Sequence, residues 1–425
     1  MKPLVMLLDG WPLIEKVCGV RNFTESLIQT IDKSYKDISL HVAIPTFSGF
    51  EEQFHLPITG LNEYLTSLKN HFKNTIIHQF PIPKPYLMFL EATANLLIIK
   101  KRKTLARFIW HRFFFPQLVK QLAPQIILHP TQAVGGRYER VFTIGIIHDT
   151  FSFVHYASRE NRNFIDRLIY RYLYRGVYLN NVKHADLLLT VSDITKIDLH
   201  LLYGIAFDKI VTIYEGAQTN FEQFAPDKTQ AVTVAEKYNL PKKYILSTNP
   251  ESYRKYPATI LHALKSLSHK HPDLHLAFFG TAPHEKVAEY STHLGLQEKI
   301  RFLGEIASED LPYIYHNAQC LIFNTLAEGF GLPVLEAMWS QTPVIASRVP
   351  PLFEVYRDNI MYVDPFDPNE LHTLLMQIID NKSLRKKIVS RQLQAAQQYT
   401  WTKISSVLIP ILKGIPHNSQ NGSFE

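Results

Sequence analysis

The sequence predicts an α/β protein with two doubly wound, Rossmann-like domains in tandem, and three observations support this fold class. Short apolar runs recur along the chain with helical patterns between them. The runs are nearly continuous, as in parallel strands that helices cover on both faces. With 425 residues, the chain is too long for one compact core and fits two domains of ordinary size. Ligands bind at the carboxyl ends of parallel strands, so we expect the two domains to face each other across a cleft.

The first domain is predicted to span residues 1–222. It opens with an apolar run from Leu4 to Leu8 that ends at Asp9 and has the length of a buried strand, too short for a signal-peptide core. Seven segments are predicted strands: Leu4–Leu8, Leu40–Ile44, Thr75–Phe80, Ile126–His129, Phe142–Ile147, Leu187–Val191 and Ile210–Tyr214.

The second domain is predicted to span residues 240–398, after a break around Thr219–Lys243 that contains two prolines and a weakly periodic charged middle. A final apolar helix over about 400–414 could pack back on the first domain, and residues 415–425 form a polar tail that we expect to be disordered. Six further strands are predicted: Tyr244–Ser247, Leu274–Phe279, Ile300–Leu303, Cys320–Phe323, Pro343–Ala346 and Met361–Val363.

The amino-acid composition indicates the cellular compartment of the protein. The chain has only two cysteines, Cys18 and Cys320, so a disulfide framework is not expected and a reducing compartment fits. No stretch approaches the roughly 20 apolar residues of a membrane span. We therefore expect a soluble, cytoplasmic protein.

The formal net charge of +7 favours anionic partners. Its densest patch, Lys100-Lys101-Arg102-Lys103, precedes an aromatic stretch that ends in Phe113-Phe114-Phe115. One interpretation of Lys100–Phe115 is a peripheral contact with the inner membrane face. The other, which the pattern alone favours, is a core helix with a solvated basic face. The basic residues form no recognisable nucleic-acid reading element, so we expect no nucleic-acid partner.

The most informative segment runs from Phe323 to Met338 and leads from a predicted strand into a helix. Gly329 and Gly331 let a ligand approach the main chain closely. Pro333 suits the first helical turn, and the free N–H groups there form a site for a phosphate. Glu328 and Glu336 would lie about 12 Å apart along a helix, too far for a shared-proton pair. That spacing suits two carboxylates that grip different hydroxyl groups across a central diphosphate, the layout of a nucleotide sugar.

This segment resembles the Glu-x7-Glu signature of the group 1 family of retaining glycosyltransferases, which have the GT-B fold. Further matches follow in family order between about Gly145 and Leu371. They are Ala185-Asp186 through Leu189-Thr190-Val191-Ser192 to Tyr203-Gly204-Ile205, Lys209-Ile210-Val211 to Tyr214-Glu215-Gly216, Arg254-Lys255, Phe302-Leu303-Gly304 with Glu309-Asp310-Leu311, and Glu354-Val355 with Val363-Asp364-Pro365.

The resemblance implies transfer of a hexosyl group (mannose, glucose or N-acetylhexosamine) from a GDP- or UDP-sugar to a glycan or lipid-linked acceptor, with retention, in surface polysaccharide synthesis. Arg254 and Lys255 would hold the diphosphate, Glu328 would orient the sugar, and His148 would contact it. Glu336 would accept the ribose hydroxyls. The remaining donor-binding residues implied are Gly19, Gly304, Gly329, Phe330, Gly331 and Leu332.

The sequence departs from the family at two places. It has Thr248-Asn249-Pro250 where relatives often have Gly-Arg or Gly-Thr, and Glu215 where asparagine is common. Because of these differences, the resemblance does not indicate which donor is bound. The 19 histidines show no ligand spacing, so we expect no metal and no cofactor besides the nucleotide sugar. Two alternatives stay open: a nucleotide-sugar epimerase of the same fold, and a non-catalytic nucleotide-sugar-binding protein.

Overall fold

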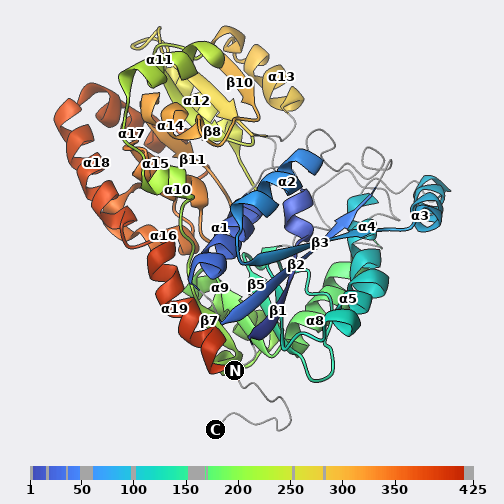
Figure 1. Cartoon of the computed structure of the whole chain (residues 1–425). Coiled ribbons are helices and arrows are strands. Elements are labelled where there is room, and N and C mark those ends of the chain that lie inside the picture. The colour runs from blue at the N-terminus through green and yellow to red at the C-terminus, as the bar shows by residue number, and fades with distance from the viewer. Residues whose placement is uncertain are drawn as a thin grey trace. The chain divides into compact units, whose positions relative to one another are not determined.

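The computed structural model describes residues 3–15, 19–34, 37–47, 61–96, 102–151, 168, 171–250, 254–280 and 284–415. The chain forms two compact units: unit 1 comprises Met1–Ile213 and Ile404–Glu425, and unit 2 comprises Tyr214–Lys403. Each unit is built on a parallel sheet with helices between its strands (Figure 1). The prediction of two doubly wound domains is therefore confirmed, whereas their arrangement across a cleft stays a prediction.

Unit 1 contains a seven-stranded sheet of order β3-β2-β1-β4-β5-β6-β7. The strand order reverses at β1, where Leu8 pairs with Val42 of β2 on one side and with Leu128 of β4 on the other. Because parallel crossovers are right-handed, this reversal places helices on both faces of the sheet. The strands are β1 (Leu4–Asp9), β2 (Ile38–Thr46), β3 (Thr75–Pro81), β4 (Ile126–His129), β5 (Phe142–Ile147), β6 (Leu187–Thr190) and β7 (Ile210–Thr212).

Local sequence signals set the helix ends in unit 1. The side chain of Ser192 accepts a hydrogen bond from the Thr195 N–H and caps α9, and Gly204, with φ of 67°, ends that helix in the left-handed region. The helices are η1 (Trp11–Ile14), α1 (Gly19–Ser34), α2 (Leu61–His71), α3 (Lys84–Leu96), α4 (Arg102–Ile109), η2 (Trp110–Phe114), α5 (Phe115–Leu122), η3 (Arg171–Tyr178), α8 (Leu179–His184), α9 (Asp193–Tyr203) and η4 (Phe207–Lys209).

Unit 2 contains a six-stranded sheet of order β10-β9-β8-β11-β12-β13, which reverses between β8 and β11. Its core packs strand residues such as Ile245 and Ile322 against helix residues such as Leu264 and Leu375. The strands are β8 (Tyr244–Thr248), β9 (His275–Phe279), β10 (Ile300–Gly304), β11 (Leu321–Phe323), β12 (Val344–Ser347) and β13 (Met361–Val363). The helices are α10 (Thr219–Glu222), α11 (Lys228–Lys237), α12 (Pro257–Leu267), α13 (Glu285–His293), η5 (Gln297–Lys299), α14 (Leu311–Asn317), α15 (Leu332–Trp339), α16 (Pro350–Tyr356), η6 (Arg357–Asn359), α17 (Pro368–Asp380) and α18 (Lys382–Ala396). The last helix, α19 (Trp401–Gly414), begins in unit 2 and continues into unit 1.

The boundary between the units lies at Ile213, upstream of the end at residue 222 that the sequence suggested. The reason is that the intervening segment packs on unit 2. Phe221 lies against the ring of Tyr315, 5.9 Å between centroids, and the Glu222 carboxylate accepts a hydrogen bond from the Trp401 N–H. From Ile404 onward, α19 belongs to unit 1. Ile415 is buried, so the predicted disordered tail does not begin there, and residues 416–425 lie outside the described part.

The basic and aromatic stretch forms α4, the π-helical turn η2 and α5. Trp110, Phe114 and Phe115 are buried, as the core-helix interpretation requires, whereas Arg112 and Phe113 are exposed. Lys100 and Lys101 lie outside the described residues. No helix in the described part is both long and apolar enough to cross a membrane.

Candidate functional site

Arg254, Lys255 and Glu328 of unit 2 gather where the strand order reverses, at the carboxyl ends of β8 and β11. Two loops meet there. Lys255, downstream of β8, forms an isolated antiparallel bridge with Thr325, just after β11. The Leu326 N–H donates to the Arg254 carbonyl at 2.8 Å. These main-chain bonds hold Arg254 and Lys255 against the segment that carries Glu328.

Three of the four residues predicted to be catalytic form one ion cluster. The Lys255 ammonium lies 2.9 Å from Glu328 Oε1, and the Arg254 guanidinium lies 3.4 Å from Glu328 Oε2. The Thr325 hydroxyl lies 3.3 Å from Glu328 Oε1. The side chains of Lys255 and Glu328 are only 9% and 10% exposed. Two cations and one carboxylate leave the cluster with one net positive charge, which suits a diphosphate ligand.

Burial and pairing act together on the charges of this cluster. Burial lowers the pKa of Lys255 to about 8, although the neighbouring Glu328 carboxylate opposes this shift. Burial by itself would raise the pKa of Glu328, but the charges of Arg254 and Lys255 outweigh it and hold that pKa below its ordinary value. At neutral pH both partners are therefore charged. The ammonium also lies 3.4 Å from the ring centre of Phe323, which adds a cation–π contact.

Buried hydrogen bonds hold the loop that carries Glu328 in place. The Thr325 N–H donates to Ser347 Oγ at 2.8 Å, and Ser347 Oγ donates to Asn324 Oδ1 at 2.7 Å. The Asn324 amide in turn donates to the Tyr256 carbonyl at 2.8 Å. Buried polar groups that are satisfied in this way hold one conformation, so the ion cluster sits on a defined support.

Helix α15 begins at the predicted phosphate site. Gly331 caps it with φ of 88°, and Pro333 occupies its first turn. A Cβ at Gly331 would lie 2.5 Å from Leu352 Cδ2, so glycine is required both by its backbone angle and by the space. The Gly331 carbonyl accepts the Tyr356 hydroxyl at 3.0 Å. Phe330 is buried against Tyr356 and Tyr399, so it contributes main chain rather than ring to the site.

Glu336 has partners different from those of Glu328. It is 7% exposed, and its Oε2 accepts a hydrogen bond from the Tyr315 hydroxyl at 2.8 Å. In the described part of the chain, no other hydrogen bond joins the Glu336 side chain to a neighbour, so Oε1 has no donor there. Burial raises the pKa of Glu336 to about 7, and the nearby Glu215 carboxylate adds to the shift. No sequence signal pointed to Tyr315, which lies on α14.

Gly304, one of the residues predicted to bind the donor, lies at the end of β10. Gly304 is exposed and has φ of 68°. The Phe302 ring is stacked on His284, with ring centres 4.3 Å apart, and on Phe278. Gly329, predicted with these residues, is buried between Glu328 and Phe330.

In unit 1 the two residues predicted to bind the donor, Gly19 and His148, both follow strands of the sheet, β1 and β5. Gly19 is exposed at the start of α1, and His148 follows β5. The His148 ring packs edge-on against Phe23, one turn after Gly19, with centroids 4.8 Å apart. Its Nε2 lies 3.0 Å from the Pro130 carbonyl, which fixes the ring.

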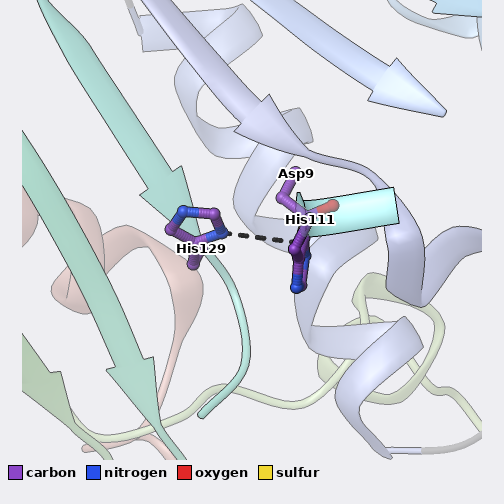
Figure 2. Close-up of side chains that lie close together, drawn as sticks. All are labelled: Asp9, His111 and His129. Carbon is purple, nitrogen blue, oxygen red and sulfur yellow. Dashed lines mark hydrogen bonds and ion pairs between the residues drawn. The ribbon is translucent and has the colours of Figure 1, made fainter. Parts of the chain in front are cut away.

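A buried cluster in unit 1 was missed by the sequence reasoning. Asp9 at the end of β1, His111 in η2 and His129 at the end of β4 point toward one another (Figure 2). Asp9 Oδ2 lies 2.8 Å from His111 Nε2 and 3.5 Å from His129 Nδ1. Asp9 directly follows one predicted strand and His129 ends another, which is a usable signal, but His111 has none.

Asp, His and His form a donor set that a divalent metal ion accepts. The hydrogen bonds favour a different arrangement. The Gly135 N–H donates to His129 Nε2 at 3.3 Å, so the proton of a neutral ring lies on Nδ1, facing Asp9. The Trp11 N–H and the Trp110 indole donate to the other Asp9 oxygen at 3.2 and 3.1 Å. Four donors therefore surround one carboxylate.

The pKa shifts of Asp9 and His111 agree with a cluster that is held by hydrogen bonds. Burial by itself would raise the pKa of Asp9, but the adjacent His111 and His129 hold it well below its ordinary value. Burial lowers the pKa of His111 to about 4 despite the neighbouring carboxylate. Asp9 is thus ionised and His111 neutral at neutral pH, and a neutral imidazole still donates its N–H. That the protein needs no metal stays a prediction.

Two family models match the chain. The model described as glycosyl transferases group 1 matches residues 232–394, and the model described as glycosyltransferase family 4 matches residues 89–221. The first includes Arg254, Lys255, Glu328 and Glu336, and the second includes His148.

Curated relatives are similar over part of their length. O-antigen chain mannosyltransferase B of Escherichia coli is 29% identical over 249 residues, 57% of this chain and 64% of the relative. Mannosylfructose-phosphate synthase of Agrobacterium fabrum is 27% identical over 50% of this chain and 49% of its own length. O-antigen chain mannosyltransferase RfbU of Salmonella typhimurium is 27% identical over 55% and 59%. The chain thus spans about half to two thirds of these relatives.

Solved structures are similar over nearly the whole chain. Anabaena Alr3699/HepE in complex with UDP and glucose has a TM-score of 0.69 at 18% identity, covering 97% of this chain and 100% of that one. WaaG, a glycosyltransferase involved in lipopolysaccharide biosynthesis, has a TM-score of 0.66 at 14% identity, covering 97% and 100%. At such identities these likenesses show the fold alone.

Proposed function

The chain belongs to the group 1 family of glycosyltransferases, and on this premise we propose that it moves a hexosyl group from a nucleoside diphosphate sugar to a glycan or lipid-linked acceptor, with retention of configuration. The observation that carries the proposal is the ion cluster of Arg254, Lys255 and Glu328 at the reversal of strand order in unit 2. This is where parallel α/β sheets bind nucleotides. The mannosyltransferase names of two relatives support a hexose and a role in surface polysaccharide synthesis.

In the proposed reaction, the bond between the sugar's anomeric carbon and the β-phosphate oxygen breaks, and the acceptor hydroxyl oxygen bonds to that carbon. The hydroxyl proton passes to the departing diphosphate. Negative charge builds on the departing nucleoside diphosphate. Arg254, Lys255 and the N–H groups at the start of α15 neutralise it, and such groups act most strongly where water is excluded. Their charge makes a metal ion unnecessary in this proposal.

The two glutamates take separate roles because they have separate partners. Glu336 accepts the ribose hydroxyls through the oxygen that Tyr315 does not occupy. Glu328, held by both cations, orients the transferred hexose. For His148 and Gly19 of unit 1, donor binding stays a prediction from the family resemblance.

The acceptor part of the proposal is a glycan or a lipid-linked glycan. A lipid-linked acceptor would bring the protein to a membrane surface as a peripheral partner. The donor nucleotide is GDP or UDP.

The test is release of nucleoside diphosphate from a panel of GDP- and UDP-sugars by the full chain and its variants. Glu336→Ala should weaken donor binding by about 1.5 to 3 kcal/mol, because a charged hydrogen-bond partner is lost. Glu328→Ala should lower turnover more than donor affinity, since orientation counts mainly in the transition state.

Glu289→Ala is a matched control, because this α13 carboxylate is 76% exposed. It should behave as wild type. An epimerase would interconvert donor sugars without releasing nucleoside diphosphate. Near-native turnover and affinity in both the Glu328 and Glu336 variants would show that the site is assigned wrongly.

A further inference from the structure

Unit 1 has its own reversal of strand order, at β1. Parallel sheets bind ligands outside the carboxyl ends of the strands at such a point. Here β1 ends in Asp9 and β4 in His129, whose side chains belong to the buried cluster (Figure 2). The chain continues into Trp11 after β1 and into Thr131 after β4. A ligand of unit 1 is therefore expected at these two segments.

Helix α4 brings the guanidinium of Arg107 to this edge of the sheet. Its Nη2 donates a hydrogen bond to the hydroxyl of Thr131. Its central carbon lies 5.9 Å from the ring centre of Trp11, within reach of a cation–π contact. Both partners are firmly placed, because Trp11 is 0% and Thr131 5% exposed. The charge is thus held beside the segments that follow β1 and β4.

The Arg107 guanidinium lacks an anionic partner. Within the residues that the structure describes, the bond to Thr131 is the only hydrogen bond it makes, and no ion pair includes it. Its Nε is buried and has no hydrogen-bond partner there. A guanidinium has five N–H donors, and a half-buried charge without a counter-ion costs free energy. An oxyanion that accepts two parallel N–H bonds would remove this cost.

Two other half-buried arginines show how this chain satisfies a guanidinium that needs no ligand. Arg21 forms an ion pair with Glu25 at 3.0 Å. Arg385 donates to a side-chain amide oxygen at 2.8 Å and to a main-chain carbonyl at 3.0 Å. Against these, Arg107 has one neutral hydroxyl. The difference indicates that the remaining donors of Arg107 serve a ligand.

The carboxylates near Trp11 are engaged with other donors. Glu15 accepts a hydrogen bond from the Trp11 indole at 2.9 Å and pairs with the Lys103 ammonium at 3.1 Å. Asp9 receives the four donors described above. Arg107 therefore contributes a positive charge that these acids do not balance.

We propose that Arg107 binds a phosphate group of the acceptor at the carboxyl ends of β1 and β4. A phosphate presents oxygens in the spacing that a guanidinium fork matches. That this ligand is the acceptor rests on the proposed function. Two kinds of acceptor carry such a group: a glycan joined to a lipid through a diphosphate, and a phosphorylated sugar.

The test is calorimetric titration of the full chain with pyrophosphate, mannose 6-phosphate and mannose, while an excess of UDP or GDP fills the donor site. The nucleotide removes the phosphate binding that Arg254 and Lys255 would provide. Wild type should still bind a phosphate probe. Tighter binding of pyrophosphate indicates the diphosphate of a lipid carrier, and tighter binding of mannose 6-phosphate indicates a phosphorylated sugar.

Variants assign this binding to Arg107. Arg107→Met should weaken it about tenfold or more, because a charged contact is lost. Arg107→Lys should fall between, since it keeps the charge but not the fork. Arg137→Met, the matched control, removes a guanidinium of unit 1 that is 65% exposed, and it should bind as wild type does. Any binding of mannose, which has no phosphate, should be the same in all variants.

Melting curves separate binding from a structural role. Without ligand, Arg107→Met removes a half-buried charge that has no counter-ion in the described part of the chain, so it should melt no lower than wild type. Arg385→Met breaks two hydrogen bonds and should melt lower. With nucleotide present, the phosphate probe should raise the melting temperature of wild type but not that of Arg107→Met.

The proposal is overturned if wild type binds neither phosphate probe once the donor site is filled, or if Arg107→Met binds them as tightly as wild type. It is also overturned if Arg107→Met melts as low as Arg385→Met while Arg107→Lys keeps wild-type binding, since the arginine would then be structural. If neither nucleotide binds, or no donor yields nucleoside diphosphate, the proposed function fails. Titration without nucleotide then still measures phosphate binding by Arg107.

Discussion

Glu336 makes the stability of unit 2 depend on pH in a direction that can be worked out. The folded state raises the pKa of this carboxyl from 4.5 to about 7, because the side chain is buried. The folded chain therefore binds one more proton than the unfolded chain between these pH values. Stability is fully present below about pH 4.5 and is lost as the pH rises through about 7. The shift corresponds to about 3 kcal/mol.

Glu336→Gln should remove this loss, since glutamine stays neutral and its oxygen can still accept the Tyr315 hydroxyl. At pH 8 the variant should be more stable than wild type by about 3 kcal/mol, or about 6–12 °C in the melting temperature of a unit of this size. At pH 5 the two should melt nearly alike. The measurement is thermal unfolding followed by circular dichroism at both pH values, with the exposed Glu289→Gln as control.

Donor affinity should follow the same titration of Glu336, but it should change in the direction opposite to stability. The ionised carboxylate is the stronger acceptor for ribose hydroxyls, so donor affinity should rise over the range in which stability falls. A Glu336→Gln variant less stable than wild type at both pH values, or a pH dependence of melting that the substitution leaves unchanged, would refute the assignment of this titration to Glu336.

Three further predictions use other parts of the structure. Gly331→Ala should lower the free energy of unfolding by more than the roughly 1 kcal/mol expected for Gly304→Ala. Both glycines have a positive φ, but only at Gly331 would a Cβ meet Leu352. Equal losses of stability in urea unfolding would contradict that clash. Asp9→Asn should destabilise unit 1 by about 3 kcal/mol or more, because one oxygen that accepts from His111 becomes a donor, and native-like melting would show that the cluster is dispensable. EDTA should leave most of the transferase rate intact; loss of activity restored by Mn²⁺ or Mg²⁺, or a metal measured in the purified protein that Asp9→Asn removes, would overturn the metal-free account.

The sequence by itself determined the strands of both sheets and which charged residues of the second unit come together. All 13 predicted strands are present in the described residues, because a buried parallel strand is written locally as a short, nearly continuous apolar run. The glycines and Pro333 likewise set the start of α15 without help from distant residues. Even the meeting of Arg254 and Lys255 with Glu328 follows from strand ends that share one edge of a sheet.

Tertiary structure alone decided which distant side chains meet and which apolar ones are covered. His111 joins Asp9 across 102 positions of sequence, and Tyr315 reaches Glu336 from another helix. No local pattern encodes these approaches, since they depend on the order of strands and on how helices pack over them. For the same reason the sequence left two interpretations of the basic, aromatic stretch open, a core helix and a membrane contact. Packing buried Trp110 and left Phe89 on α3 in solvent, because only one face of each helix can contact the sheet.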